Sequence, residues 1–156
     1  MIKGLYEAHL PVSDLDRSIR FYESLGLELA HRTEGRAFFW IEKGRSWLAL
    51  WVAEQVNILY HVSIRHTAFL IELEDIDKAK EWLQERNIDV VNFYEFEPFQ
   101  QPVVPPLYPQ VHAAVYFEDP DGNLLELIAP VKLDVQEYFE TIELDKWIQM
   151  SNKLEN

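Results

Sequence analysis

An internal repeat constrains the fold of this chain more than any other feature. Residues 13–29 align with residues 74–90 at a constant offset of 61, so that acidic starts, apolar positions and a closing Gly26 or Asn87 coincide. Each copy opens with Ser or Asp residues suited to a helix N-cap, carries apolar residues at helical spacing, and closes on a residue type common just after helices. The repeat therefore predicts two similar modules, each with one helix.

Segments with strand-like patterns flank both predicted helices. We expect strands at about 4–12, 27–32, 36–42 and 46–53 in the first copy, and at about 64–73, 88–93, 111–118 and 123–130 in the second. Turns containing Gly44 and Gly122 precede the last strand of each set, because glycine readily takes the positive φ angle of such turns. The order βαβββ, repeated twice, predicts an α+β fold.

Two further segments break the symmetry of the repeat. Residues 94–110 hold five prolines and four aromatic residues, which favours a long ordered loop over a strand and suits a lid or a dimer contact. Residues 134–150 have an amphipathic pattern that predicts a C-terminal helix. We therefore expect a single domain over 1–130, with modules at about 1–60 and 61–130, and a helical extension over 131–156.

Composition excludes several classes of function. A net charge of −13 argues against binding to nucleic acid or to an anionic membrane surface. The absence of cysteine excludes disulfides, thiolate metal ligands and a cysteine nucleophile. No run of apolar residues is long enough for a membrane span, and residues 1–7 contain no apolar signal core, which together predict a cytoplasmic location.

The distribution of Lys and Arg along the chain indicates what charge the ligand carries. Between Arg86 and Lys132 the chain has no Lys or Arg at all. We therefore do not expect side chains of this half of the protein to hold a multiply charged anion.

Three residues in separate predicted strands are candidates for metal binding. His9, His66 and Glu126 each lie within a strand-like segment, and Glu126 stands in the apolar run Leu-Leu-Glu-Leu-Ile. A carboxylate in such surroundings is costly to bury without a cation or another partner. Two imidazoles and one carboxylate suffice to hold a divalent metal and leave open coordination positions.

The combined motifs resemble the vicinal oxygen chelate superfamily, which includes glyoxalase I, bleomycin-resistance proteins, extradiol dioxygenases and fosfomycin-resistance thiol transferases. The resemblance rests on His9 with the segment 12–27 that follows it, on His66 at the start of the second module, and on the segment 116–126 that ends at Glu126. It covers about residues 1–130 and leaves out the C-terminal extension.

This resemblance implies a U-shaped mixed sheet with helices on its convex side and a concave cavity for metal and substrate. It implies His9, His66 and Glu126 as the metal ligands, and a homodimer as the assembly. Family members with four ligands carry a carboxylate at about the position of Ala49, which cannot ligate. The four-ligand glyoxalase I type is therefore disfavoured.

Other residues are candidates for the cavity that the resemblance implies. We expect Phe39, Trp47 and Trp51 to form its walls and to bind substrate. Tyr116 matches a substrate-contacting tyrosine of the fosfomycin transferases, and His112 has the same strand parity as Tyr116 and could exchange protons near neutral pH. Tyr116 and His112 are therefore the candidate catalytic residues.

The expected function is that of a metal-dependent enzyme of the lyase, transferase or dioxygenase type, acting on a small oxygen-chelating substrate. Two imidazoles among the ligands favour Mn²⁺, Fe²⁺, Zn²⁺, Co²⁺ or Ni²⁺, without choosing among them. The lack of Lys and Arg in the second half favours an uncharged or aromatic substrate. The alternative is a metal-free protein that binds a drug or metabolite, as bleomycin-resistance proteins do.

Overall fold

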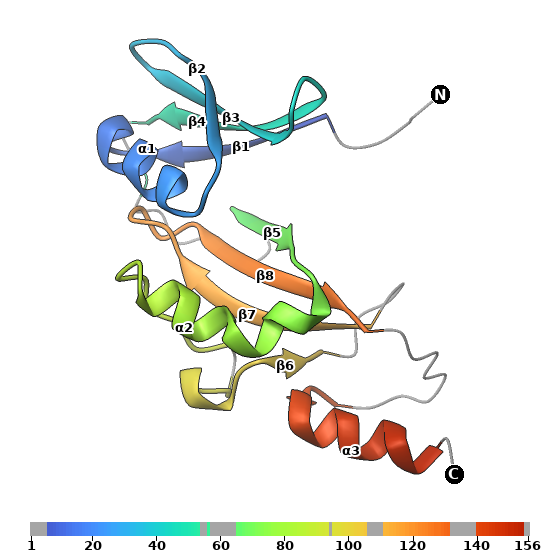
Figure 1. Ribbon diagram of the computed structural model, residues 1–156. Helices are drawn as coiled ribbons and strands as arrows, with labels where there is room; N and C mark the ends of the chain where they lie inside the picture. The colour runs from blue at the N-terminus through green and yellow to red at the C-terminus, as the bar shows by residue number, and fades with distance from the viewer. Residues whose placement is uncertain are drawn as a thin grey trace. The chain divides into compact units, whose positions relative to one another are not determined.

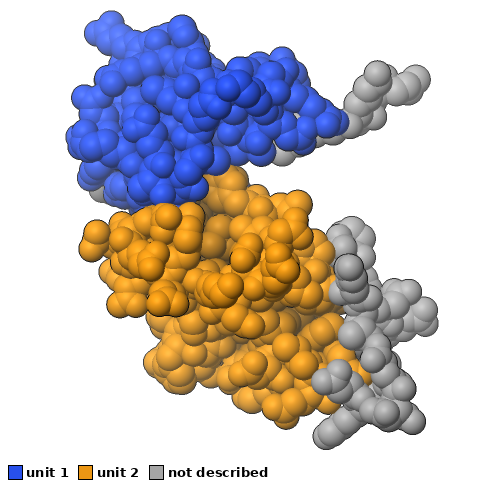
Figure 2. Space-filling view, viewed as in Figure 1, with its two compact units in different colours: residues 1–66, 119–124 blue, residues 67–118, 125–156 orange. Residues whose placement is uncertain are grey.

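The computed structural model describes residues 6–53, 56, 65–93, 95–105, 111–131 and 140–154. The chain divides into two compact units, which Figure 2 shows in different colours. Unit 1 contains residues 1–66 and 119–124, and unit 2 contains residues 67–118 and 125–156. No helix in the described part of the chain is long and apolar enough to span a membrane.

Unit 1 is built on a four-stranded sheet with one helix, as the first copy of the repeat predicts. Its elements are β1 (Glu7–Val12), α1 (Leu15–Ser24), β2 (Glu28–Arg32), β3 (Arg36–Glu42) and β4 (Ser46–Val52), with the strand order β1-β4-β3-β2. Strand β1 pairs with β4 in parallel, and the other neighbours are antiparallel. The predicted strands and helix of this copy are confirmed.

One face of this sheet and the apolar face of α1 form the core of unit 1. The buried residues are Leu10, Val12, Ala37, Phe39, Leu48 and Leu50 from the strands, and Leu15, Ile19 and Tyr22 from the helix. The Asp14 side chain caps α1 by accepting from the Arg17 N–H at 2.9 Å, and Gly26 follows the helix with a φ of 86°. Residues of β1 that alternate with Leu10 and Val12 lie on the opposite face of the sheet, away from α1.

Unit 2 is built on a five-stranded sheet with the order β5-β8-β7-β6-β9 (Figure 1). The strands are β5 (His66–Leu70), β6 (Val103–Val104), β7 (His112–Glu118), β8 (Leu124–Pro130) and β9 (Ile142–Glu143), and the first residues of β5 and β8 belong to unit 1. The helical elements are the 3-10 helices η1 (Leu73–Lys78) and η2 (Pro98–Gln100) and the α-helices α2 (Ala79–Gln84) and α3 (Leu144–Leu154). Strands β5 and β8 run in the same direction, since Leu124 N–H donates to the Arg65 carbonyl near one end and Ile71 N–H to the Ile128 carbonyl near the other.

Three predictions for the second copy and the C-terminal extension are wrong in part. Residues 88–93 form no strand but take part in two isolated bridges, Val90 with Phe117 and Phe93 with Phe96. The segment 94–110, expected to be a loop without strands, contains η2 and the short β6. The helix expected at 134–150 begins only at residue 144 and is preceded by β9, while residues 134–139 lie outside the described residues.

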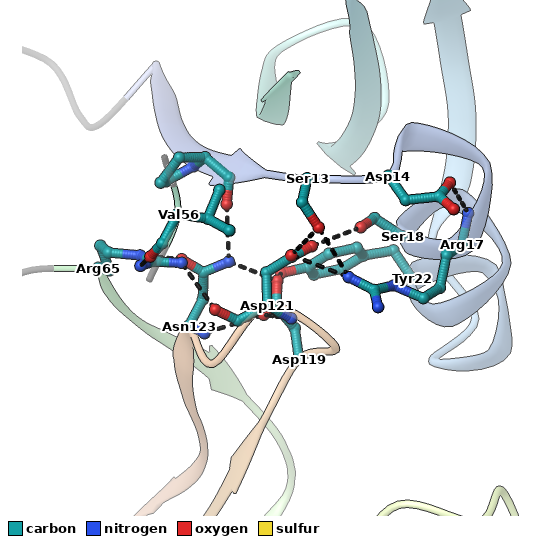
Figure 3. Close-up of polar contacts among 11 residues, drawn as sticks. Ser13, Asp14, Arg17, Ser18, Tyr22, Val56, Arg65, Asp119, Asp121 and Asn123 are labelled. Atoms are coloured by element: carbon teal, nitrogen blue, oxygen red, sulfur yellow. Dashed lines mark hydrogen bonds and ion pairs between the residues drawn. The ribbon is translucent and has the colours of Figure 1, made fainter. Parts of the chain in front are cut away.

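The turn between β7 and β8 is anchored within unit 1 by Asp119 (Figure 3). One Asp119 oxygen accepts from the backbone N–H groups of Asp121 and Asn123, both at 2.9 Å. The other accepts from the Tyr22 hydroxyl at 2.9 Å and from the Asn123 amide at 2.6 Å. Burial and the adjacent Asp119 carboxylate raise the pKa of Tyr22 well above its usual value, so Tyr22 remains a donor.

Asp121 joins the same turn to the start of α1. Its carboxylate accepts from Ser13, from the Arg17 guanidinium at 2.8 Å and from the Ser18 hydroxyl at 3.3 Å. On the other side, Arg65 donates to the Asn123 side chain at 2.6 Å and to the Asp121 carbonyl at 2.9 Å. These contacts fix the turn from which β7 leads back to Tyr116 and β8 leads on to Glu126.

Candidate metal centre

His9 lies on the face of the unit 1 sheet that is opposite α1. Its side chain is 42% exposed, and its Nε2 atom is 3.2 Å from the Glu7 carboxylate. Glu7 also accepts from the Trp47 indole N–H at 2.9 Å, and the hydrogen bonds from His9 and Trp47 lower the pKa of Glu7. The His9 ring stacks on Trp51, with centroids 5.3 Å apart. A carboxylate that orients an imidazole in this way is common beside metal-binding histidines.

His66 is the first residue of the edge strand β5 and is exposed. The residue before it, Arg65, has a φ of 65°, a left-handed conformation that is strained for a side chain of this size. The contacts of Arg65 with Asn123 and Asp121 hold it in this conformation. The backbone that carries His66 is therefore fixed by the same turn that joins β7 and β8.

Glu126 lies in unit 2 on β8 and is only 4% exposed. Backbone hydrogen bonds from Asp119 to Asn123 and from Val131 to Val111 define the β7–β8 hairpin. Asp119 and Asn123 are a pair in this antiparallel hairpin. The residue before Asp119 by three positions, Tyr116, is therefore directly opposite the residue after Asn123 by three positions, Glu126. The carboxylate also lies 3.6 Å from the Nε2 atom of the buried His112. Glu126, Tyr116 and His112 therefore share one face of the unit 2 sheet.

Tyr116 is held by two residues that the sequence did not single out. Its ring stacks flat on Phe93, with centroids 3.9 Å apart and an angle of 5° between the planes. Its backbone N–H donates at 2.9 Å to the side chain of Gln101, which is 2% exposed and donates in turn to the Val91 carbonyl at 2.7 Å. Nothing in the sequence distinguishes Gln101 from its neighbour Gln100, so only the fold reveals this role.

The aromatic residues predicted to line the cavity fall on two different faces. Trp47 and Trp51 share the face of His9, because the β1–β4 register pairs His9 with Ala49 and Pro11 with Trp51. Phe39 lies on the opposite face, fully buried, with its ring 5.8 Å from that of Tyr22. The prediction for Phe39 is therefore wrong, because this residue belongs to the core beneath α1. Ala49 lies directly beside His9, as expected for the position at which family members with four ligands carry a carboxylate.

The three candidate ligands are divided between the units, His9 and His66 in unit 1 and Glu126 in unit 2. Within the part of the chain that the structure describes, no three or more His, Asp or Glu residues are grouped so that they could hold a metal ion. The chemistry of the donor set nevertheless fits a divalent first-row metal, with two imidazole nitrogens and a buried carboxylate. The environments also suit this role, since a carboxylate orients His9 and an imidazole accompanies Glu126.

Comparison with known families identifies the class of protein. Residues 4–127 match the Glyoxalase/Bleomycin resistance protein/Dioxygenase superfamily. The chain belongs to this superfamily, as the resemblance to vicinal oxygen chelate proteins predicted.

Individual relatives include a metallothiol transferase and fosfomycin-resistance proteins. The chain is 30% identical over 131 residues to "Metallothiol transferase FosB" of Staphylococcus epidermidis, covering 83% of each protein. The crystal structure of fosfomycin resistance protein FosX from Mesorhizobium loti matches with a TM-score of 0.58 and 26% identity over 84% of this chain and 95% of that one. FosX from Listeria monocytogenes, complexed with Mn(II) and 1S,2S-dihydroxypropylphosphonic acid, has the same fold, with a TM-score of 0.61 and 24% identity over 84% and 94% of the two chains. These relatives confirm the predicted class, a metal-dependent enzyme of the superfamily.

Proposed function

We propose that the protein is a metal-dependent thiol transferase that acts on a small, oxygen-chelating electrophile. His9, His66 and Glu126 are its metal ligands. The observation that carries this proposal is the buried Glu126 carboxylate, which faces His112 and Tyr116 in a chain that is 30% identical to a metallothiol transferase. Burying a carboxylate in an apolar strand is costly, and a metal ligand is a role that offsets this cost.

Mn²⁺ is the ion that we propose among the five candidates. The FosX structure that contains Mn(II) supports this choice, and a set of two imidazoles and one carboxylate is compatible with it. When bound, the ion supplies Lewis-acid polarisation of a substrate oxygen.

The thiol comes from a co-substrate, since the chain contains no cysteine. In the transfer, the thiolate sulfur forms a bond to an electrophilic carbon while the bond from that carbon to oxygen breaks. The electron pair of the broken bond remains on the oxygen, which then takes up a proton and so balances the proton lost by the thiol. His112 and Tyr116 are the candidate proton donors on the face of Glu126, and Phe93 and Gln101 hold Tyr116 in place.

Thiol consumption in the presence of fosfomycin and Mn²⁺ tests this function. The wild type should consume thiol at a rate that disappears on chelation of the metal, and Glu126→Gln should lose this activity. Glu118→Gln is the matched control, because Glu118 is exposed on the neighbouring strand β7 and should leave the rate unchanged. Metal-independent binding of fosfomycin without thiol consumption would contradict the proposal and favour the metal-free drug-binding alternative.

We also propose a homodimer. The loop that was expected to contribute a dimer contact carries Phe99, which is 76% exposed. This exposed ring supports the proposal together with the resemblance, which implies a homodimer. Sedimentation equilibrium should give twice the chain mass of 18.5 kDa, and a monomer at micromolar concentration would contradict this proposal.

A further inference from the structure

Arg36 is held beside His9 through a shared contact with Trp51. Arg36 on β3 pairs in register with Trp51 on β4, and its guanidinium carbon lies 3.6 Å from the centroid of the indole ring. The same ring stacks on His9, which comes from β1 on the other side of β4. Cation–π contact thus fixes a positive charge one aromatic ring away from a proposed metal ligand.

Among the described residues, no carboxylate forms an ion pair with Arg36. Three other arginines of unit 1 form ion pairs, Arg17 with Asp121 at 2.8 Å, Arg32 with Asp16 at 2.6 Å and Arg45 with Glu42 at 2.7 Å. Among the residues that the structure describes, Arg36 has the Trp51 ring as its partner and no acidic one. What distinguishes Arg36 is that its guanidinium is held against an aromatic ring beside His9, which leaves its charge available to an anionic ligand.

Trp51 adds a second hydrogen-bond donor beside Arg36. Its indole N–H is buried, and no described residue accepts a hydrogen bond from it. A buried N–H without an acceptor is unfavourable, so this group also suits a ligand oxygen. The guanidinium and the indole together offer hydrogen bonds and positive charge at one place on the face of His9.

We propose that Arg36 and Trp51 bind an oxyanion, a phosphonate or a carboxylate, of one of the two reactants beside His9. This proposal rests on the proposed function, because it places the anion next to a metal ligand. It changes the expected substrate class, since the lack of Lys and Arg between residues 87 and 131 is compensated by an arginine of unit 1. Arg36 is thereby a specificity-determining residue for a charged reactant.

Calorimetric titration with two probes tests the proposal and identifies the source of the anion. Methylphosphonate represents an anionic electrophilic substrate, and N-acetylcysteine represents a thiol with a carboxylate. In Arg36→Met, which keeps an unbranched apolar stem but removes the guanidinium, the affinity for at least one probe should fall about tenfold or more. A loss for methylphosphonate alone assigns the anion to the substrate, and a loss for N-acetylcysteine alone assigns it to the thiol.

Arg45→Met is the matched control, since it removes an equal charge from the β3–β4 turn and should leave both affinities unchanged. Arg36→Lys should retain part of the affinity, because it keeps the charge but not the planar guanidinium. Unchanged affinity for both probes in Arg36→Met, or no binding of either probe to the wild type, would overturn the proposal.

Measuring the Mn²⁺ content of each variant distinguishes failure of the anion-binding proposal from failure of the proposed function. Arg36→Met should bind Mn²⁺ as the wild type does while losing the probe. If the wild type binds no metal, the thiol-transfer proposal fails, whereas titration of the metal-free protein still decides whether Arg36 binds the oxyanion.

Discussion

At the scale of single residues, Asp121 illustrates how a buried carboxylate is stabilised in unit 1. Burial by itself would raise the pKa of Asp121, but hydrogen bonds from Ser13 and Arg17 and the charge of Arg17 outweigh it, so the pKa is lowered. A group whose pKa is lower in the folded than in the unfolded state stabilises the fold above its unfolded pKa of about 3.9. This contribution is lost as pH falls through the folded pKa.

Asp121→Asn should therefore lower the free energy of unfolding at pH 7 by about 1–3 kcal/mol, because Arg17 loses its charged partner and a buried acceptor is replaced. Urea denaturation measured at pH 7 and at pH 3 checks this, and the difference between wild type and variant should shrink at the lower pH. Asp16→Asn is the control, since the exposed Asp16–Arg32 pair should contribute less than about 1 kcal/mol. An equal loss of unfolding free energy at pH 7 and at pH 3 would contradict the stabilising role of the ionised Asp121 carboxylate.

Residue-scale prediction from sequence succeeded where alternation was unambiguous. Leu10 and Val12 alternate with His9, so the alternation along β1 is enough to place His9 on the face opposite these two core residues. Phe39 was misplaced because it stands within three consecutive aromatic residues, Phe38, Phe39 and Trp40, which suit either face of a strand. Only the register with β4, and the packing of Phe39 against Tyr22, decide the face.

At the scale of elements, the repeat predicted the helices and long strands but not the short pairings of unit 2. Strand β6 has two residues between Pro102 and Pro105, and no local pattern marks so short a strand. Its pairing with β7 and β9 depends on chain segments far away in the sequence. Residues 88–93 fail to form a strand partly because the Val91 carbonyl is satisfied by the Gln101 side chain instead of a neighbouring strand.

The position of Tyr116 depends on Gln101, since this one side chain joins β7 to the segment at Val91. Gln101→Leu keeps the size of the side chain but leaves the Tyr116 N–H and the Val91 carbonyl without this partner. We expect a loss of about 1–3 kcal/mol in the free energy of unfolding and a lower rate of thiol transfer. The control is Gln100→Leu, because the neighbouring Gln100 accepts from the Glu97 N–H and caps the short η2 helix instead. Wild-type stability and rate in Gln101→Leu would contradict the role of Gln101.

At the scale of the whole molecule, the chain crosses between its units more than once. Unit 1 includes the turn 119–124, whose two ends continue directly into β7 and β8 of unit 2. Because Asp119 and Asp121 hold this turn on α1, loss of structure in unit 1 releases the end of the central hairpin of unit 2. The repeat in the sequence predicted two modules. It could not predict that the turn 119–124 of the second module belongs to unit 1, because this depends on side-chain contacts between residues about a hundred positions apart.

The two units should consequently unfold together. Hydrogen exchange followed by mass spectrometry across a urea series should show peptides from β4 and β7 losing protection at the same midpoint. Asp121→Asn should lower both midpoints equally, although Asp121 itself belongs to unit 1. A lowered midpoint for β4 with an unchanged midpoint for β7 would show that the units unfold independently.

The measurement that tests the central claim most directly is metal stoichiometry by elemental analysis after dialysis against Mn²⁺ and removal of unbound ion. The wild type should retain about one ion per chain, and His9→Ala, His66→Ala and Glu126→Gln should each lose it. His31→Ala, which removes an exposed histidine of β2, should retain it. Full metal content in the three ligand variants, or none in the wild type, would contradict the assignment of His9, His66 and Glu126 as the metal centre.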